Sequence, residues 1–140
     1  MRIFDWLRGL QGMYVSQKTF VFNDEGKFLT LLRTKTAPKR PLKWDLPGGA
    51  HEAGEDPMEG AKREILEETG LTVADLKPLT LAGEYVGNRW GVTVAYTAKA
   101  LTTDVRLSYE HDEYRWVNKE EFLELDSSEK WKGIAQAYLV

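Results

Sequence analysis

The 140-residue chain contains no cysteine. A disulfide framework, thiolate catalysis and a cysteine-ligated zinc or iron–sulfur centre are therefore excluded. A large excess of one charge is absent as well, because 19 basic and 22 acidic side chains leave a formal net charge of −3. Unspecific nucleic-acid binding depends on a basic surface, so we expect no nucleic-acid partner. A chain without cysteine suits a reducing compartment, and we expect the cytoplasm.

Long hydrophobic runs are also absent. No window approaches the roughly 18 apolar residues of a membrane span, so we expect no membrane partner. Residues 1–15 are mildly apolar, but polar residues interrupt them, so we expect this segment to pack on the core rather than to act as a signal peptide. With 42% hydrophobic residues, no repeat and no linker, residues 1–140 are expected to form a single domain.

The apolar pattern predicts strands alternating with helices. Strands are expected at 15–23, 28–32, 44–52, 79–86, 90–100 and 116–117, and helices at 57–69, after Asn118, and from Trp131 to Leu139. The first two strands are separated by turn residues and read as a hairpin, and residues 33–43 read as a basic loop. We therefore expect an α/β (α+β) fold in which helices pack on a mixed sheet.

The helix at 57–69 has the clearest start and stop signals. Asp56 is a candidate N-cap, Pro57 suits the first helical position, and Glu59 is placed to complete a capping box. Gly70 follows as the residue that can adopt the left-handed conformation at the C-terminus.

Three carboxylates share one face of this helix. Glu64, Glu67 and Glu68 stand at i, i+3 and i+4, an arrangement of like charges that destabilises an isolated helix. A hard divalent cation such as Mg²⁺ would offset that repulsion, because it prefers carboxylate oxygens. The structural alternative is a solvated acidic helix in which Arg63 makes ordinary ion pairs with Glu59 or Glu67.

The wider pattern decides between these readings. Gly49, Glu55 and the run from Arg63 to Leu71 occupy every specified position of the Nudix box, so the chain resembles the Nudix hydrolases over 49–71. The preceding run from Trp44 to Gly49 is also similar to the family. The resemblance implies an α/β/α sandwich with a mixed sheet, in which the box forms a loop–helix–loop. It also implies an enzyme that cleaves nucleoside diphosphate derivatives with Mg²⁺ or Mn²⁺.

The resemblance assigns roles by position. The expected metal-binding residues are Gly49, through its carbonyl, and Glu64, Glu67 and Glu68, with Glu52 as an outer contributor. Glu55 and Arg63 are expected to brace the box, and Gly70 to end the helix. The general base is expected to be Glu64 or a glutamate of the later loop, where Glu113 is preferred to Glu110.

The substrate is less well defined by the sequence. The segment 106–116 is similar to the diadenosine tetraphosphate hydrolases of the family, but those enzymes usually carry a lysine where this chain has Gly48. ADP-ribose hydrolases of the family often carry a proline about sixteen residues after the box, and this chain has Gly87 at that position. We therefore expect a (deoxy)nucleoside triphosphate, with a dinucleoside polyphosphate or a nucleotide sugar such as ADP-ribose as alternatives.

Substrate-binding residues are expected among basic and aromatic side chains, namely Arg33, Lys43, Trp44 and Tyr85. A catalytically inactive nucleotide-binding module is the rival reading, but such modules usually lose a box glutamate or the arginine, and this chain keeps them. The isomerase branch of the family needs a cysteine and is excluded. A homodimer is expected because dimers are common in the family.

Overall fold

The computed structural model describes residues 13–140. Its elements are, in chain order, β1 (Tyr14–Phe22), β2 (Phe28–Arg33), β3 (Trp44–Asp45), β4 (Gly48–Ala50), α2 (Pro57–Thr69), β5 (Val73–Val86), β6 (Arg89–Ala100), β7 (His111–Val117), α3 (Lys119–Glu124) and α4 (Glu129–Tyr138). No helix in this part of the chain is both long enough and apolar enough to cross a membrane. The expectation for the first residues of the chain falls outside the described residues, apart from 13–15.

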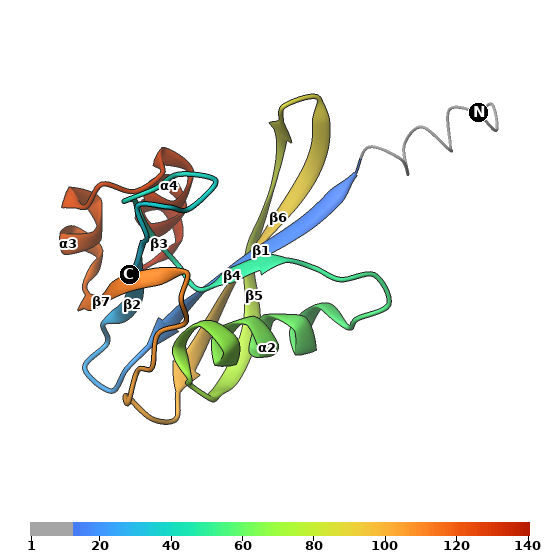
Figure 1. The fold of residues 1–140 in the computed structure, drawn as a ribbon. Coiled ribbons are helices and arrows are strands. Elements are labelled where there is room, and N and C mark those ends of the chain that lie inside the picture. Colours follow the sequence, from blue (N-terminus) through green and yellow to red (C-terminus); the bar gives the residue numbers. More distant parts are fainter. Residues whose placement is uncertain (1–12) are drawn as a thin grey trace, which may run out of the picture.

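The strands form one mixed sheet with the order β3-β2-β1-β6-β5, in which β4 pairs with β1 and β7 pairs with β2. The pairing of β1 with β6 is parallel, and the other strand pairs are antiparallel. The parallel pair places Tyr14 opposite Gly91 and continues to Phe22 opposite Lys99. The long connection between these two strands contains α2, which crosses the sheet (Figure 1).

Alternation along β1 directs successive side chains to two different cores. Phe20 packs with Phe28, Phe122 and Trp131, so this face is covered by α3 and α4. Val21 belongs to a second cluster with Leu29, Leu31, Ile65, Leu71 and Ala100, so the opposite face is covered by α2. Figure 1 shows α2 apart from the α3–α4 pair. The expected mixed sheet between helices is confirmed.

Most element boundaries agree with the sequence expectation. The helix begins after the N-cap Asp56, whose side chain accepts from Met58 N at 3.1 Å, and Gly70 ends it with a φ of 72°. The capping box predicted at Glu59 is wrong, since this side chain lies 3.3 Å from Lys62 instead. The capping box expected at Asn118 is present at the start of α3.

Two strands are longer than the sequence predicted. β5 begins at Val73 rather than 79, and β7 begins at His111 rather than 116. The register of β5 against β6 shifts twice, between Ala74 and Lys77 and between Pro78 and Thr80. Such irregularities break the period-two pattern on which strand prediction depends. The β5–β6 ribbon extends beyond the helices at its turn (Figure 1).

Candidate active site

Helix α2 presents its acidic face next to the strand β4. Ala61 and Ile65 are fully buried and hold the opposite side of the helix against the sheet. Thr69 is also buried and donates its hydroxyl to the carbonyl of Ile65, and the N–H of Gly70 donates to Leu66 O at 2.8 Å. The orientation of the glutamates is therefore fixed by core contacts along the middle of α2 and by its C-terminal cap.

Arg63 braces the loop before the helix. Its Nε donates to Glu55 Oε2 at 2.7 Å and its Nη2 to Glu55 Oε1 at 3.1 Å, which is a bidentate ion pair. Its Nη1 lies 3.1 Å from Glu67 Oε2, and its Nη2 lies 3.7 Å from Glu52 Oε1. The hydrogen bonds from Arg63 hold the pKa of Glu55 below its ordinary value. The predicted pairing with Glu67 is present, whereas the alternative partner Glu59 pairs with Lys62.

Glu68 is the most buried of the three glutamates, with 4% of its surface exposed. Its Oε1 accepts a hydrogen bond from the N–H of Gly48 at 3.1 Å. Burial raises its pKa to about 8, against the effects of Lys18 and the Gly48 N–H, and the charges of Glu64 and Glu110 raise it further. The carboxyl group is therefore poorly neutralised by the protein itself.

Glu64 lies between Glu68 and the backbone of Gly49. A Cβ at Gly49 would lie 3.2 Å from Glu64 Oε1, so the strand β4 approaches this carboxylate as closely as a glycine allows. Burial raises the pKa of Glu64, Arg63 opposes this shift, and the charge of Glu67 adds to it. The neighbouring Glu68 side chain also works to lower the pKa of Glu64. The carboxyl groups of Glu64 and Glu68 are therefore close enough for each to affect the pKa of the other.

The oxygen donors fit a hard divalent cation. The buried Glu68 and the half-buried Glu64 have raised pKa values and adjoin the backbone of Gly48 and Gly49, and carboxylate and carbonyl oxygens are the ligands that Mg²⁺ prefers. Within residues 13–140 no three acidic or histidine side chains converge into a ready-made metal site. Glu67 remains apart because it is 58% exposed and paired with Arg63.

The later loop brings Glu110 toward these carboxylates. The charge of Glu110 raises the pKa of both Glu64 and Glu68, and its backbone carbonyl accepts from Thr34 N at 3.2 Å. Glu113 lies on β7 opposite Leu32, and its Oε1 is 3.5 Å from Arg115 Nε. Of these two glutamates, Glu110 is the one whose charge acts on Glu64 and Glu68, whereas the sequence prediction preferred Glu113.

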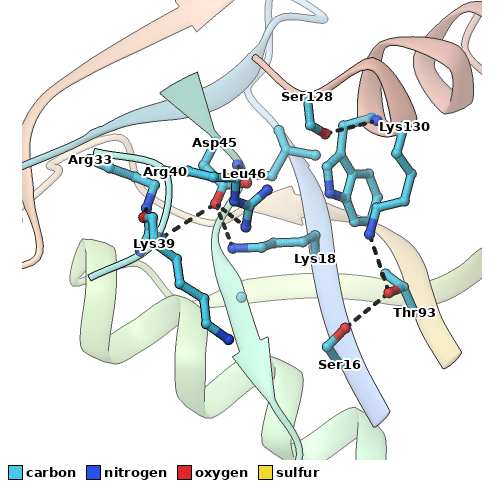
Figure 2. A network of polar contacts seen from close by, with 12 residues as sticks. Ser16, Lys18, Arg33, Lys39, Arg40, Asp45, Leu46, Thr93, Ser128 and Lys130 are labelled. Carbon is cyan, nitrogen blue, oxygen red and sulfur yellow. Dashed lines mark hydrogen bonds and ion pairs between the residues drawn. The ribbon is translucent and has the colours of Figure 1, made fainter. Parts of the chain in front are cut away.

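The four predicted substrate-binding residues are placed differently from one another. Arg33 is largely buried, and its Nη1 lies 3.6 Å from Asp45 Oδ2 (Figure 2). Lys43 forms an exposed ion pair with Asp126 at 2.8 Å. Trp44 is 8% exposed, with the guanidinium group of Arg115 4.6 Å from its ring centroid. Tyr85 is on the β5–β6 ribbon, 71% exposed and packed edge-on to Trp90.

Lys18 and His111 adjoin the site and were not expected from the sequence. Lys18 on β1 is 9% exposed, and its Nζ donates to Asp45 Oδ2 at 2.9 Å. His111 is 5% exposed, and its Nδ1 lies 3.7 Å from Glu68 Oε2. Burial, together with the charge of Lys18, lowers the pKa of His111 to about 4, so its ring is neutral. A lysine within an apolar strand was the available signal for the first, and His111 has no metal-ligand spacing that would mark it.

Similarity to known proteins identifies the family of this chain. The family model described as the NUDIX domain matches residues 15–137. The chain belongs to the Nudix family. It is therefore a Nudix hydrolase, and members of this family use divalent metal ions in hydrolysing phosphoanhydrides.

Individual Nudix proteins match over much of the chain. The asymmetrical bis(5'-nucleosyl)-tetraphosphatase of Rattus norvegicus is 35% identical over 101 residues, covering 66% of this chain and 67% of its own length. The nucleoside triphosphatase NudI of Salmonella arizonae is 28% identical over 120 residues, covering 76% and 85%. The MutT protein from Methanosarcina mazei superposes with a TM-score of 0.79 at 29% identity, covering 89% and 91% of the two chains.

Proposed function

We propose that the chain hydrolyses a phosphoanhydride bond of a nucleoside diphosphate derivative at the carboxylates of α2. Glu64, Glu67, Glu68 and the carbonyl of Gly49 hold Mg²⁺ or Mn²⁺ in this proposal. The observation that carries it is the pair formed by the buried Glu68 and the half-buried Glu64 beside β4, whose raised pKa values mark carboxylates that the protein does not neutralise. A bound metal ion supplies charge neutralisation at the phosphoryl oxygens and lowers the pKa of water.

In this scheme the chain's own residues orient the box glutamates and accept the proton of the attacking water. Arg63, held by Glu55, fixes the direction of Glu67, and the Gly48 N–H fixes Glu68. Glu110 accepts the proton of the attacking water, because it lies close enough for its charge to act on both buried glutamates. Glu113 is the less suited candidate, since Arg115 pairs with it.

The proposed substrate is a (deoxy)nucleoside triphosphate, which would yield the monophosphate and pyrophosphate. The similarity to a nucleoside triphosphatase over 76% of the chain supports it. A dinucleoside polyphosphate is the second candidate, because the relative with 35% identity is a bis(5'-nucleosyl)-tetraphosphatase and segment 106–116 is similar to such enzymes. Arg33 is the substrate-binding residue best placed among those predicted, since it lies beside Asp45 next to β4.

The decisive experiment is a substrate panel with purified protein and Mg²⁺. Nucleoside triphosphates, dinucleoside tetraphosphates and ADP-ribose are compared by kcat/KM, and the products are identified by chromatography. Monophosphate together with pyrophosphate is the expected result. Absence of phosphoanhydride cleavage with every compound and with either metal would overturn the proposal and favour a binding module.

A further inference from the structure

Three cations surround the buried carboxylate of Asp45 and form what we call the Asp45 cation cluster. It consists of Lys18 from β1, Arg33 from β2 and Arg40 from the loop before β3. The Oδ2 atom of Asp45 lies 2.9 Å from Lys18 Nζ, 3.6 Å from Arg33 Nη1 and 3.5 Å from Arg40 Nη2. Figure 2 shows these side chains converging on Asp45 from separate elements.

The cluster carries more positive charge than Asp45 can balance. Burial works to raise the pKa of Asp45, but Lys18 and Arg40 outweigh it and hold the pKa below its ordinary value, so the group is ionised. Its other oxygen already accepts the N–H of Leu46 at 2.8 Å. One carboxylate therefore faces three cations, and only Lys18 makes a hydrogen bond to it. Lys18 and Arg33 are largely buried, whereas Arg40 is 46% exposed, so two of the three cations lie where positive charges are costly unless an anion joins them.

The cluster lies directly beside the carboxylates of α2. Lys18 is paired with Gly48 across β1 and β4, and the Gly48 N–H donates to Glu68. The charge of Lys18 accordingly acts on Asp45 and on Glu68. A ligand that bridges the two groups would meet the oxygen donors at one end and the cations at the other.

An unpartnered side chain lies between these two groups. His111 has 1% of its side chain exposed, and neither ring nitrogen has a hydrogen-bond partner among the described residues. It pairs with Arg33 across β2 and β7, and its Nδ1 is 3.7 Å from Glu68 Oε2. Gln17, Thr19 and His51 also have buried polar atoms without a partner among the described residues, and a ligand or a water satisfies such groups.

We propose that the Asp45 cation cluster binds the phosphates of the substrate that lie beyond the scissile anhydride, with His111 donating a hydrogen bond to one of their oxygens. Guanidinium groups suit this task because they bind phosphate in a bidentate manner. The inference rests on the proposed function and narrows it. The substrate carries at least three linked phosphates, as in a nucleoside triphosphate or a dinucleoside polyphosphate, rather than two phosphates linked to a sugar.

Neighbouring basic residues do not share these features. Lys43 has its own carboxylate, Asp126, in an exposed pair. Lys39 is exposed and serves Arg33 only through its backbone carbonyl, while its side chain extends away from Asp45 (Figure 2). The excess of positive charge is therefore a property of the cluster rather than of the basic loop as a whole.

Binding of inorganic tripolyphosphate tests the proposal without any turnover. The intact chain is titrated calorimetrically with tripolyphosphate in the presence of Mg²⁺. Arg40→Gln, which leaves the Lys18–Asp45 pair in place, is expected to weaken binding about tenfold, the effect of losing one charge-assisted contact. Lys39→Gln, a matched loss of charge in the same loop, is expected to stay within about twofold. Lys18→Met is measured too, after its thermal unfolding has been checked.

Kinetics provide the second test. Arg40→Gln is expected to lower kcat/KM for a nucleoside triphosphate about tenfold, mainly through KM, and to leave ADP-ribose within about twofold of the wild type. Unchanged tripolyphosphate affinity in both Arg40→Gln and Lys18→Met would overturn the inference, as would a wild-type preference for ADP-ribose. A wild type that binds tripolyphosphate through the cluster yet cleaves no nucleotide would support the phosphate site and contradict the proposed function.

Discussion

Two carboxyl groups beside β4 are buried to nearly the same extent, but their pKa values are shifted in opposite directions. Glu68 is 4% exposed and its pKa is raised to about 8, whereas Asp45 is 2% exposed and its pKa is held below the ordinary value. Burial alone would raise both. The difference lies in their partners, because Asp45 has three cations within 3.6 Å, whereas Glu68 has the more distant charge of Lys18, one backbone N–H and two acidic neighbours. The chain neutralises Asp45 itself, and in our proposal an ion from solution neutralises Glu68.

Removing the charge of a box glutamate should have the largest effect. Glu67→Gln and Glu68→Gln each keep the side-chain volume but lose an anionic metal ligand, so kcat/KM is expected to fall by about two to three orders of magnitude. Circular dichroism should show an unchanged fold, because α2 loses repulsion rather than a core contact. Glu59→Gln, on the exposed side of the same helix, serves as the control. Full activity in both box variants would contradict the metal assignment.

Removing the other carboxylate should affect stability first. Asp45→Asn leaves Lys18 buried without its counter-ion, so the free energy of unfolding is expected to fall by about 3 kcal/mol. Urea titration measures the loss, and Asp126→Asn, which breaks the exposed pair with Lys43, should cost less than about 1 kcal/mol. Adding Lys18→Met to Asp45→Asn should restore part of the loss. Equal effects of Asp45→Asn and Asp126→Asn would show that Asp45 is not balancing buried charge.

The two halves of this comparison were not equally predictable from the sequence. The carboxylates of α2 lie within one helical turn of each other, and the signals at Asp56 and Gly70 are local, so the helix could be predicted from the sequence, whereas the box 49–71 was located by its resemblance to the family. Lys18 and Asp45 are 27 residues apart and meet only because β2 pairs with both β1 and β3 in the folded sheet. No spacing rule connects such residues. The bidentate pair of Arg63 and Glu55 was expected from the resemblance to the family rather than from a spacing rule, and the structure contains it.

Glu110 and Glu113 are the candidates for the general base, and substitution of each one tests which of them accepts the proton. Glu110→Gln is expected to lower kcat about a hundredfold with little change in KM, because the water loses its proton acceptor. Glu113→Gln is the matched variant, and its pairing with Arg115 predicts a change within about threefold. Steady-state kinetics with Mg²⁺ decide between them. A large effect at Glu113 alone would restore the preference drawn from the sequence, and no effect at either would assign the base to Glu64.

The pH dependence of stability gives the smallest expected effect. The pKa of Glu68 rises from 4.5 to about 8 on folding, so the folded chain binds more protons than the unfolded chain between these values and loses stability as pH rises. The pKa of His111 falls from 6.5 to about 4, which costs stability only as pH drops below 6.5.

Between pH 6.5 and 8 only Glu68, and not His111, makes stability depend on pH. The metal-free wild type should therefore lose about 2 kcal/mol of unfolding free energy in that interval. Urea titrations in EDTA measure this slope, which Glu68→Gln should flatten. Saturating Mg²⁺ at pH 8 should recover the loss in the wild type, because the ion binds the deprotonated carboxylate of the folded state. A slope that persists in Glu68→Gln would mean that some other group, and not the carboxylate awaiting a cation, dominates the titration of the folded chain.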